Sequence, residues 1–270
     1  MLLVHSQAFS KFVGRLDLVV RDDRVIAHKY ELIPIDISVP DDPEIYDLLE
    51  PYYEEMLRVF DLDRVVANAE IDLHRFGSRG GDSMLGNLVA EAIQYRRGVE
   101  TDFAMTNSLG IRTDIIQGPV TIETMFNSLP FDNTITTMYL SGREIQEMLD
   151  YATDRSAGRG CSSQIQISNA SFTMNCRSGL AEDILIAGEP LRLDSIYEMA
   201  TNNYLAWGGS GFDVLERNTT KIDTGIAMRE AVIDYMREHP SLPECFDDTD
   251  DLSRCRNGIA VEDGRIKTVH

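Results

Sequence analysis

The chain has 270 residues, enough for one large domain or two small ones with a buried core. Hydrophobic residues make up 43% and charged residues 26%, a composition typical of folded chains and not of disordered ones. The chain has 25 Lys and Arg residues and 45 Asp and Glu residues, so its formal net charge is −20. This charge disfavours a general nucleic-acid binder, but it allows a small phosphorylated ligand held by a local group of arginines.

The beginning of the chain shows no targeting segment. No apolar run reaches the roughly 18–20 residues of a membrane span. The residues Met1-Leu2-Leu3-Val4-His5 lack the basic and apolar regions of a signal peptide. They are apolar from the start, like a strand entered halfway, so we expect the chain to begin inside something larger.

The first 60 residues have the pattern of a strand pair followed by a helix. Two half-buried strands are predicted at 14–20 and 24–32, with Asp22-Asp23 as the polar turn between them. Asp41-Asp42-Pro43 predicts the start of a helix with one apolar face, which Pro51 could kink. This combination resembles a domain junction more than a core.

The remainder alternates helices and strands. Helices are predicted over residues 83–97, 121–127, 141–152 and about 225–238. The first of these helices is amphipathic and is predicted to stop at Gly98. Ser141 and Glu144 form a capping box at the start of the third. Strands are predicted over residues 102–106, 134–140, 164–167 and 197–201. With no internal repeat, residues about 62–238 are predicted to form one α+β domain, a mixed β-sheet with packed helices.

The four cysteines fall into two local pairs, Cys161 with Cys176 and Cys245 with Cys255. Four cysteines allow three connectivities, of which pairing sequence neighbours is the simplest. Four buried free thiols are the alternative. Two local disulfides would place the protein in the periplasm or outside the cell.

The sequence shows no complete catalytic apparatus. Asp72-Leu73-His74 matches the D-x-H that opens metallophosphoesterase sites, but the Gly-Asn-His and Gly-His-x-His motifs that supply further ligands are absent. A three-residue match in a chain rich in Asp is expected by chance, so we predict no metal site. No G-x-S-x-G occurs, and residues 208–211 match neither a Walker loop nor a dinucleotide fingerprint.

Two sets of residues could bind a ligand. Arg75 and Arg79 lie just before the helix that begins near Ser83, where guanidinium and helix N–H groups could share an anion, with Asp82 orienting the arginines. Phe131 and Tyr204 lie near glycine and proline turns and could stack on a flat ligand. The alternatives are a solvated loop whose arginines offset acidic neighbours, and aromatic side chains at the rim of a core.

Five segments form an ordered pattern between residues about 64 and 238. The segments are Arg79-x-x-Asp82-Ser83-x-Leu85-Gly86-Asn87-Leu88, Asn107-Ser108-Leu109-Gly110-Ile111-Arg112, Gly118-Pro119-Val120-Thr121 through Leu129-Pro130-Phe131-Asp132-Asn133, Leu140-Ser141-Gly142-Arg143-Glu144-Ile145, and Thr201-Asn202-Asn203-Tyr204-Leu205-Ala206-x-Gly208-Gly209-Ser210-Gly211-Phe212.

In this order they resemble motifs of the C-terminal, substrate-binding domain of the secreted 5′-nucleotidase and UDP-sugar hydrolase family. The motifs are R-x-x-E-[ST]-x-L-G-N-L, N-x-G-G-[IL]-R, G-x-[IV]-T…L-P-F-x-N, L-[TS]-G-x-x-[IL] and [FY]-L-A-x-G-G-D-G-F. Any one match would be weak, whereas five in order are specific.

The resemblance implies a two-domain hydrolase. An N-terminal metallophosphoesterase domain with two divalent metal ions would perform the hydrolysis, and this chain would carry its last strands (1–38), a linker helix (39–60), the nucleotide-binding domain (61–240) and a C-terminal disulfide loop and tail (241–270). The domains would rotate across the linker helix, which we expect to rest on the substrate domain.

The resemblance also assigns roles to single residues. Phe131 and Tyr204 would sandwich the base between their rings, and Asn107 would hydrogen-bond its edge. Arg75, Arg79 and Arg112 would hold phosphate or ribose oxygens. No residue of this chain would be catalytic.

Ser210 departs from the family pattern, which has Asp at this position. A serine cannot accept hydrogen bonds from both ribose hydroxyls as a charged carboxylate does. A cyclic nucleotide, a UDP-sugar or a non-nucleotide substrate therefore becomes more credible.

Three hypotheses follow. The leading one is the substrate-binding part of a secreted nucleotidase, which binds a nucleotide or nucleoside, has no polymeric nucleic-acid partner, and does not hydrolyse by itself. The second is an autonomous hydrolase that uses Asp72 and His74. The third is a binding module without catalysis that has kept the fold.

Overall fold

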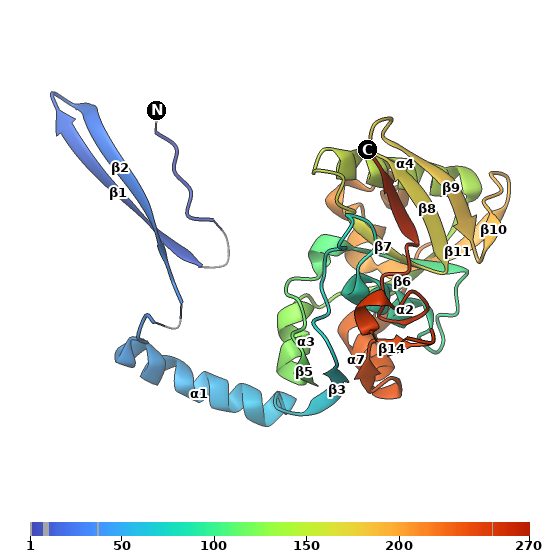
Figure 1. The fold of residues 1–270 in the computed structure, drawn as a ribbon, viewed down its shortest axis with the longest axis horizontal. Helices are drawn as coiled ribbons and strands as arrows, with labels where there is room; N and C mark the ends of the chain where they lie inside the picture. Colours follow the sequence, from blue (N-terminus) through green and yellow to red (C-terminus); the bar gives the residue numbers. More distant parts are fainter. Residues whose placement is uncertain (1, 8–10, 37, 250) are drawn as a thin grey trace. The chain divides into compact units, whose positions relative to one another are not determined.

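Figure 1 shows the fold of the chain, of which the computed structural model describes residues 2–7, 11–36, 38–249 and 251–270. The chain divides into two units, Met1–Val59 and Phe60–His270. The predicted strand pair and isolated helix lie in the first unit. The predicted alternation of helices and strands lies in the second.

A β-hairpin forms the sheet of the first unit. Strand β1 (Phe12–Arg21) pairs antiparallel with β2 (Arg24–Pro34), and the turn falls at Asp22 and Asp23 as predicted. The predicted half-burial is present only in part: Phe12, Leu16, Tyr30 and Leu32 are half-buried on one face, and no described residue of β1 or β2 is fully buried. Two strands by themselves bury little apolar surface.

The helix of the first unit is α1 (Pro43–Phe60), and its start agrees with the sequence signal. Asp42 Oδ1 accepts hydrogen bonds from the N–H groups of Glu44, at 3.0 Å, and Ile45, at 3.3 Å, as an N-cap residue does. Pro51 lies inside the helix without interrupting it. None of its residues is buried, and its packing on the substrate domain stays a prediction.

A five-stranded mixed sheet is the centre of the second unit (Figure 1). Its strands, in spatial order, are β12 (Ile222–Ala227), β6 (Thr134–Ser141), β11 (Ile196–Asn202), β4 (Phe103–Asn107) and β7 (Ile165–Ser168). Only β11 and β4 pair in parallel; the other neighbours are antiparallel. This mixed pairing fits the expected α+β fold.

The two faces of this sheet differ in chemistry because side chains alternate along a strand. Phe103 and Ile167 face a large apolar core that also contains residues of α4 (Gly142–Ala157). On the other face, Gln166 accepts a hydrogen bond from the Ser83 N–H and Ser168 donates one to Gln94. That face carries α2 (Met84–Gln94).

Helix α2 differs from the predicted helix in its burial and in where it ends. The amphipathic pattern is present, but all residues of α2 are buried because the C-terminal segment covers its polar side: Asn87 Nδ2 donates to the Val261 carbonyl at 2.7 Å. It also ends at Gln94, before the predicted stop at Gly98, and the Gln94 amide bonds to the carbonyl of Thr101 in the returning chain.

Capping residues set the starts of the next two helices. Thr121 caps α3 (Ile122–Ser128), and Ser141 with Glu144 forms the predicted capping box of α4. Helix α7 (Met228–Glu238) begins later than the predicted Gly225, because residues before it belong to β12, where Ala227 pairs with Thr134 of β6.

Smaller elements complete the second unit. A four-stranded sheet has the order β10 (Glu189–Pro190), β9 (Leu180–Ile186), β8 (Ala170–Asn175) and β16 (Ile266–Val269). The remaining sheets are β13 (Ser241–Leu242), β3 (Val65–Ala69) and β5 (Gly118–Thr121), and the pair β14 (Glu244–Cys245) and β15 (Gly258–Ile259). The remaining helical elements are short: η1 (Ser108–Gly110), α5 (Asn203–Ala206), η2 (Gly209–Gly211), α6 (Asp213–Glu216) and η3 (Leu252–Arg254).

Strand β16 shows that residues near the C-terminus take part in a sheet, since Ile266–Val269 pairs in parallel with β8. No strand was predicted there from the sequence: β16 is four residues long, and its partner β8 lies about 90 residues earlier in the chain. Such short runs carry little periodicity.

Both predicted disulfides are present. Cys161 bonds to Cys176 and Cys245 to Cys255, each with Cα atoms 5.9 Å apart, so the alternative of four free thiols was wrong. None of the described helices combines the length and the apolar character that crossing a membrane requires.

We expect the first disulfide to stabilise the fold substantially. Replacing Cys161 and Cys176 by Ser opens a loop with a sequence separation of 15 and should lower the free energy of unfolding by about 3 kcal/mol. Urea unfolding measures this difference. Peptide mapping without reductant should recover both bridges, and four alkylatable thiols in native, oxidised protein would contradict the pairing.

Candidate functional site

The C-terminal ends of β4 and β11 and the N-terminal end of β6 lie side by side at one end of the five-stranded sheet. Because β11 runs antiparallel to β6, Asn202 at the end of β11 lies opposite Ile135 at the start of β6. Because β11 runs parallel to β4, with Ala200 opposite Ala104, the end of β4 lies at the same end of the sheet. Asn107 is the last residue of β4, and the segments that follow β4 and β11 or precede β6 carry Arg112, Phe131, Tyr204 and Ser210.

Asn107 is buried at the end of β4, and its orientation is fixed by a second asparagine. Its Oδ1 accepts a hydrogen bond of 2.9 Å from Asn202 Nδ2. Asn202 also donates to Thr106 Oγ1 and caps α5 by accepting from the Leu205 N–H. Since Asn202 occupies the Asn107 carbonyl oxygen, the Nδ2 group of Asn107 is the part that can face a ligand.

Phe131 is 47% exposed in the loop before β6, and the residues on both sides of it are held firmly. Arg229 of α7, whose side chain is 11% exposed, donates to the Leu129 carbonyl at 2.8 Å and to Asp132 Oδ1 at 3.0 Å. The Arg112 guanidinium lies 5.8 Å from the centroid of the Phe131 ring. An exposed aromatic ring is thus presented by a rigid loop beside a cation.

Tyr204 lies on α5 and is 49% exposed. Its hydroxyl accepts a hydrogen bond of 3.0 Å from the backbone N–H of Ser210, and the Ser210 Oγ lies 3.4 Å away. Ser210 has a left-handed backbone, with φ 60°. Tyr204 and Ser210 therefore form one local unit.

Arg75 is half-buried and bonds mainly to the protein itself. Its Nη1 donates to the carbonyls of Ile111 and Arg112, at 3.1 and 2.8 Å, and its backbone N–H donates to Asp114 Oδ1 at 3.0 Å. His74 Nδ1 lies 3.0 Å from Asp114 Oδ2. Arg75 thus supports the segment that carries Arg112.

Asp114 is the carboxylate that bonds to both Arg75 and His74. Partial burial raises its pKa, but the hydrogen bonds from the Arg75 N–H and from His74 outweigh this, so its pKa lies below the usual value. The sequence analysis did not single out Asp114, because its partners come from a segment about 40 residues earlier in the chain.

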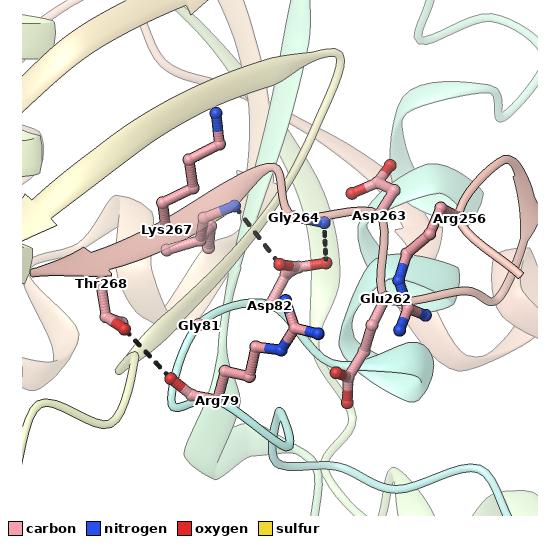
Figure 2. Close-up of a pocket in the computed structure, with 10 residues that line it drawn as sticks. Arg79, Gly81, Asp82, Arg256, Glu262, Asp263, Gly264, Lys267 and Thr268 are labelled. Carbon is pink, nitrogen blue, oxygen red and sulfur yellow. Dashed lines mark hydrogen bonds between the residues drawn. The ribbon is translucent and has the colours of Figure 1, made fainter. Parts of the chain in front are cut away.

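Arg79 lies with the C-terminal segment, as Figure 2 shows. Its backbone carbonyl accepts from Thr268 Oγ1 at 3.1 Å. Its side chain lines a cavity of about 280 Å³ together with Arg256, Glu262 and Lys267. The expected joint action of Arg75 and Arg79 at one anion therefore has no direct contact to support it.

Asp82 does not orient these arginines, contrary to expectation. It is buried, and its carboxylate accepts from Asn87 Nδ2 at 2.8 Å and from the N–H groups of Gly264 and Ile266 at 3.3 and 3.4 Å (Figure 2). Burial raises its pKa, although the Asn87 hydrogen bond opposes the rise. Asp82 joins α2 to the C-terminal segment because its carboxylate lies among these N–H donors.

The N-terminus of α2 is not an open anion site either. The Ser83 side chain accepts from the Gly86 N–H at 3.0 Å, and the Leu85 N–H donates to the His74 carbonyl at 3.2 Å. These helix donors already have partners within the protein.

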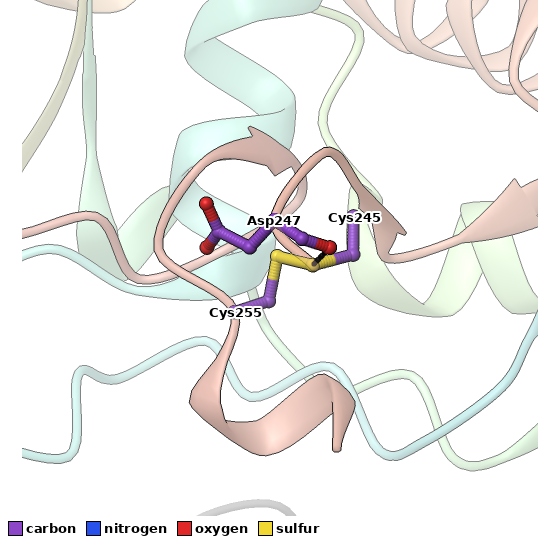
Figure 3. Close-up of side chains that lie close together, drawn as sticks. All are labelled: Cys245, Asp247 and Cys255. Atoms are coloured by element: carbon purple, nitrogen blue, oxygen red, sulfur yellow. Dashed lines mark hydrogen bonds between the residues drawn. A yellow bond between two sulfur atoms is a disulfide. The ribbon is translucent and has the colours of Figure 1, made fainter. Parts of the chain in front are cut away.

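The described residues do not fit a dimetal centre. Among them, one group of three possible ligands lies close together, Cys245, Asp247 and Cys255, and its two sulfur atoms form a disulfide (Figure 3). Disulfide sulfurs are not thiolate ligands. Asp72 accepts from the Gln117 N–H at 2.8 Å and His74 contacts Asp114. Asp72, His74 and Glu262 line one cavity, but within the described part of the chain their ligand atoms do not form a group close enough to share an ion.

Two residues that organise the candidate site, Asn202 and Arg229, were not predicted from the sequence. Asn202 had a usable signal, since an asparagine between a predicted strand and a turn is a typical N-cap. Arg229 had none, because its contacts are with residues about 100 positions earlier in the chain.

Comparison with known proteins supplies the family context. The family described as "5'-nucleotidase, C-terminal domain" matches residues 65–217. The 5'-nucleotidase of Vibrio parahaemolyticus is 25% identical over 254 residues, which cover 88% of this chain and 44% of that protein. Protein UshA of Escherichia coli is 24% identical, over 89% of this chain and 46% of its own length.

A solved structure agrees with these sequence matches. The crystal structure of a 5'-nucleotidase precursor from Thermus thermophilus superposes with a TM-score of 0.77 at 25% identity, covering 96% of this chain and 50% of that one. The chain therefore spans about half the length of the relatives that it matches.

The depressed pKa of Asp114 predicts a pH dependence of stability. A carboxylate whose pKa is lowered on folding stabilises the native state above its unfolded pKa of about 3.9, and this contribution is lost as the pH falls through the folded pKa. Urea midpoints at several pH values should show wild type more stable than Asp114→Asn at pH 6, with the difference shrinking below about pH 4. A difference that is constant from pH 6 to pH 3 would contradict the assignment.

Proposed function

The chain belongs to the 5'-nucleotidase C-terminal domain family, and we propose that it binds the substrate of a 5'-nucleotidase-type phosphoester hydrolase. The observation that carries this proposal is the meeting of three strand ends at one end of the sheet. There β4, β6 and β11 present an amide, a cation and two exposed aromatic rings in adjacent loops. These are the groups that a nucleobase and its phosphate require.

The base is proposed to stack on Phe131 and Tyr204. Both rings are about half exposed, although the loops that carry them are fixed by Arg229 and by Ser210. Rigid exposed aromatics favour stacking because little side-chain freedom is lost on binding. The Nδ2 group of Asn107 would donate to the edge of the base.

The phosphate is proposed to be bound by arginine side chains. The Arg112 guanidinium lies next to the Phe131 ring, and Arg75 donates a hydrogen bond to the backbone carbonyl of Arg112. Arg79 would reach phosphate or ribose oxygens from the side of the C-terminal segment. A few local cations suffice for a small anion even though the chain as a whole is acidic.

Ser210 offers a neutral hydroxyl at the position where the family has Asp. A ribose would lose a charged acceptor there, so cyclic nucleotides, UDP-sugars and non-nucleotide esters belong in the ligand screen beside AMP and adenosine.

Hydrolysis is proposed to need another part of the protein. A metallophosphoesterase domain of the same parent protein would bind the two divalent metals and cleave the ester, as the family resemblance implies. The two disulfides and the likeness to 5'-nucleotidases and UshA support a location outside the cytoplasm.

The aromatic pair is the first test. Phe131→Ala or Tyr204→Ala should each weaken adenosine binding about ten-fold or more, because each removes one stacking face. Isothermal titration calorimetry measures the Kd. Tyr139→Ala is the matched control, because Tyr139 is 48% exposed in β6 but lies opposite Glu198, away from the end of the sheet that carries the site. Unchanged Kd values in both site variants would contradict the proposal and favour a module that has lost its nucleotide ligand.

A second test separates phosphate from base. Arg112→Gln should weaken AMP binding about ten-fold or more, since hydrogen bonds to charged groups contribute about 1.5–3 kcal/mol, and should change adenosine binding much less. The control is Arg143→Gln on α4, which breaks an exposed ion pair with Asp194. Equal losses for AMP and adenosine would show that Arg112 acts only through Phe131.

A further inference from the structure

The loop from Gly208 to Gly211 holds a backbone conformation that its sequence does not favour throughout. Gly208, Ser210 and Gly211 all have positive φ, at 84°, 60° and 84°. Glycine adopts this region freely, but a serine there is disfavoured. Contacts from outside the loop must therefore keep Ser210 in place.

Two tyrosine hydroxyls supply those contacts. The Ser210 N–H donates to the Tyr204 hydroxyl at 3.0 Å, and the Ser210 carbonyl accepts from the Tyr151 hydroxyl at 2.8 Å. Both polar groups of one backbone unit are thus bonded to phenols that come from different helices, α5 and α4.

The glycines on either side of Ser210 make room for these rings. A Cβ atom on Gly209 would lie 2.6 Å from the Tyr204 ring, and one on Gly211 would lie 2.2 Å from the Tyr151 hydroxyl oxygen. The loop therefore packs directly against both tyrosines.

Tyr151 is held in place by packing against the core. It is half-buried on α4, and its ring packs edge-on against Phe212, 5.0 Å between centroids, while Phe212 is itself 1% exposed. Tyr204, by contrast, has about half of its surface exposed to solvent. A path of direct contacts thus joins the core to the exposed ring through Ser210.

We propose that Tyr151 is a positioning residue for ligand binding, which holds the loop of residues 208–211 so that Tyr204 is oriented before the ligand arrives. This inference rests on the proposed function, because it assumes that Tyr204 stacks on the ligand. Its physical basis is preorganisation: a ring already held in place loses less freedom on binding.

Tyr151→Phe is the decisive variant, since it removes the hydroxyl and keeps the ring against Phe212. Adenosine binding, measured by calorimetry, should weaken about three- to ten-fold, as expected for the loss of one neutral hydrogen bond. In a Tyr204→Ala background the same change should have no further effect, because the ring that Tyr151 positions is gone. A purely structural role would weaken binding equally in both backgrounds.

A second measurement needs no ligand. Hydrogen exchange followed by NMR should show the Ser210 amide exchanging at least about five-fold faster in Tyr151→Phe, because the loop opens more often. Tyr197→Phe is the matched control: it removes a half-buried hydroxyl that accepts from the Arg192 N–H, in the part of β11 far from Asn202. It should change neither the Kd nor the exchange rate.

The outcomes separate the two proposals. An unchanged Kd in Tyr204→Ala would overturn the proposed stacking on Tyr204 and the positioning role of Tyr151 with it. A weakened Tyr204→Ala beside an unchanged Tyr151→Phe would overturn the positioning role alone. Wild-type exchange at Ser210 in Tyr151→Phe would also overturn it.

Discussion

The pairing of β11 with its two neighbours decides where the candidate site forms. The parallel pairing with β4 and the antiparallel pairing with β6 bring two strand ends and one strand start to the same end of the sheet. Had β11 paired antiparallel with β4, Asn107 would lie at the opposite end, away from Tyr204. The hydrogen bonds of Asn202 to Asn107 and Thr106 then lock this alignment at the strand ends themselves.

The exposed aromatics depend on buried support. Phe131 and Tyr204 leave about half of their surface to solvent, which costs the hydrophobic stabilisation that a buried ring would provide. Each is held instead by polar bonds to its loop, from Arg229 on one side and through Ser210 on the other. Such exposure costs stability, which is the balance expected for the binding role that we propose for these rings.

A second set of contacts joins the C-terminal segment to the body of the domain. Asp82 accepts hydrogen bonds from Gly264 and Ile266, and Arg265 bonds to Glu91 of α2 at 2.7 Å. Arg265 also bonds to Asp263, at 2.6 Å, so it keeps an acidic partner if Glu91 is replaced, whereas replacing Arg265 would remove the cation that pairs with the buried Glu91. The segment therefore covers α2 and brings Thr268 to Arg79.

The sequence by itself determined the local elements and the family of the second unit. Capping residues such as Thr121 and Ser141 fix helix starts through their nearest neighbours, and five ordered motifs sufficed to identify the C-terminal nucleotidase domain. Cysteine spacing also indicated the correct pairs, because short loops close most easily.

Only the tertiary structure decided what depends on contacts between distant segments. The sequence placed Asp82 with the arginines, whereas folding places it against residues about 180 positions later. It could not show that the polar side of α2 is buried, because the segment that covers it comes near the chain's end. It could not reveal that Tyr151 touches Ser210, since local propensity carries no information about partners 59 residues apart.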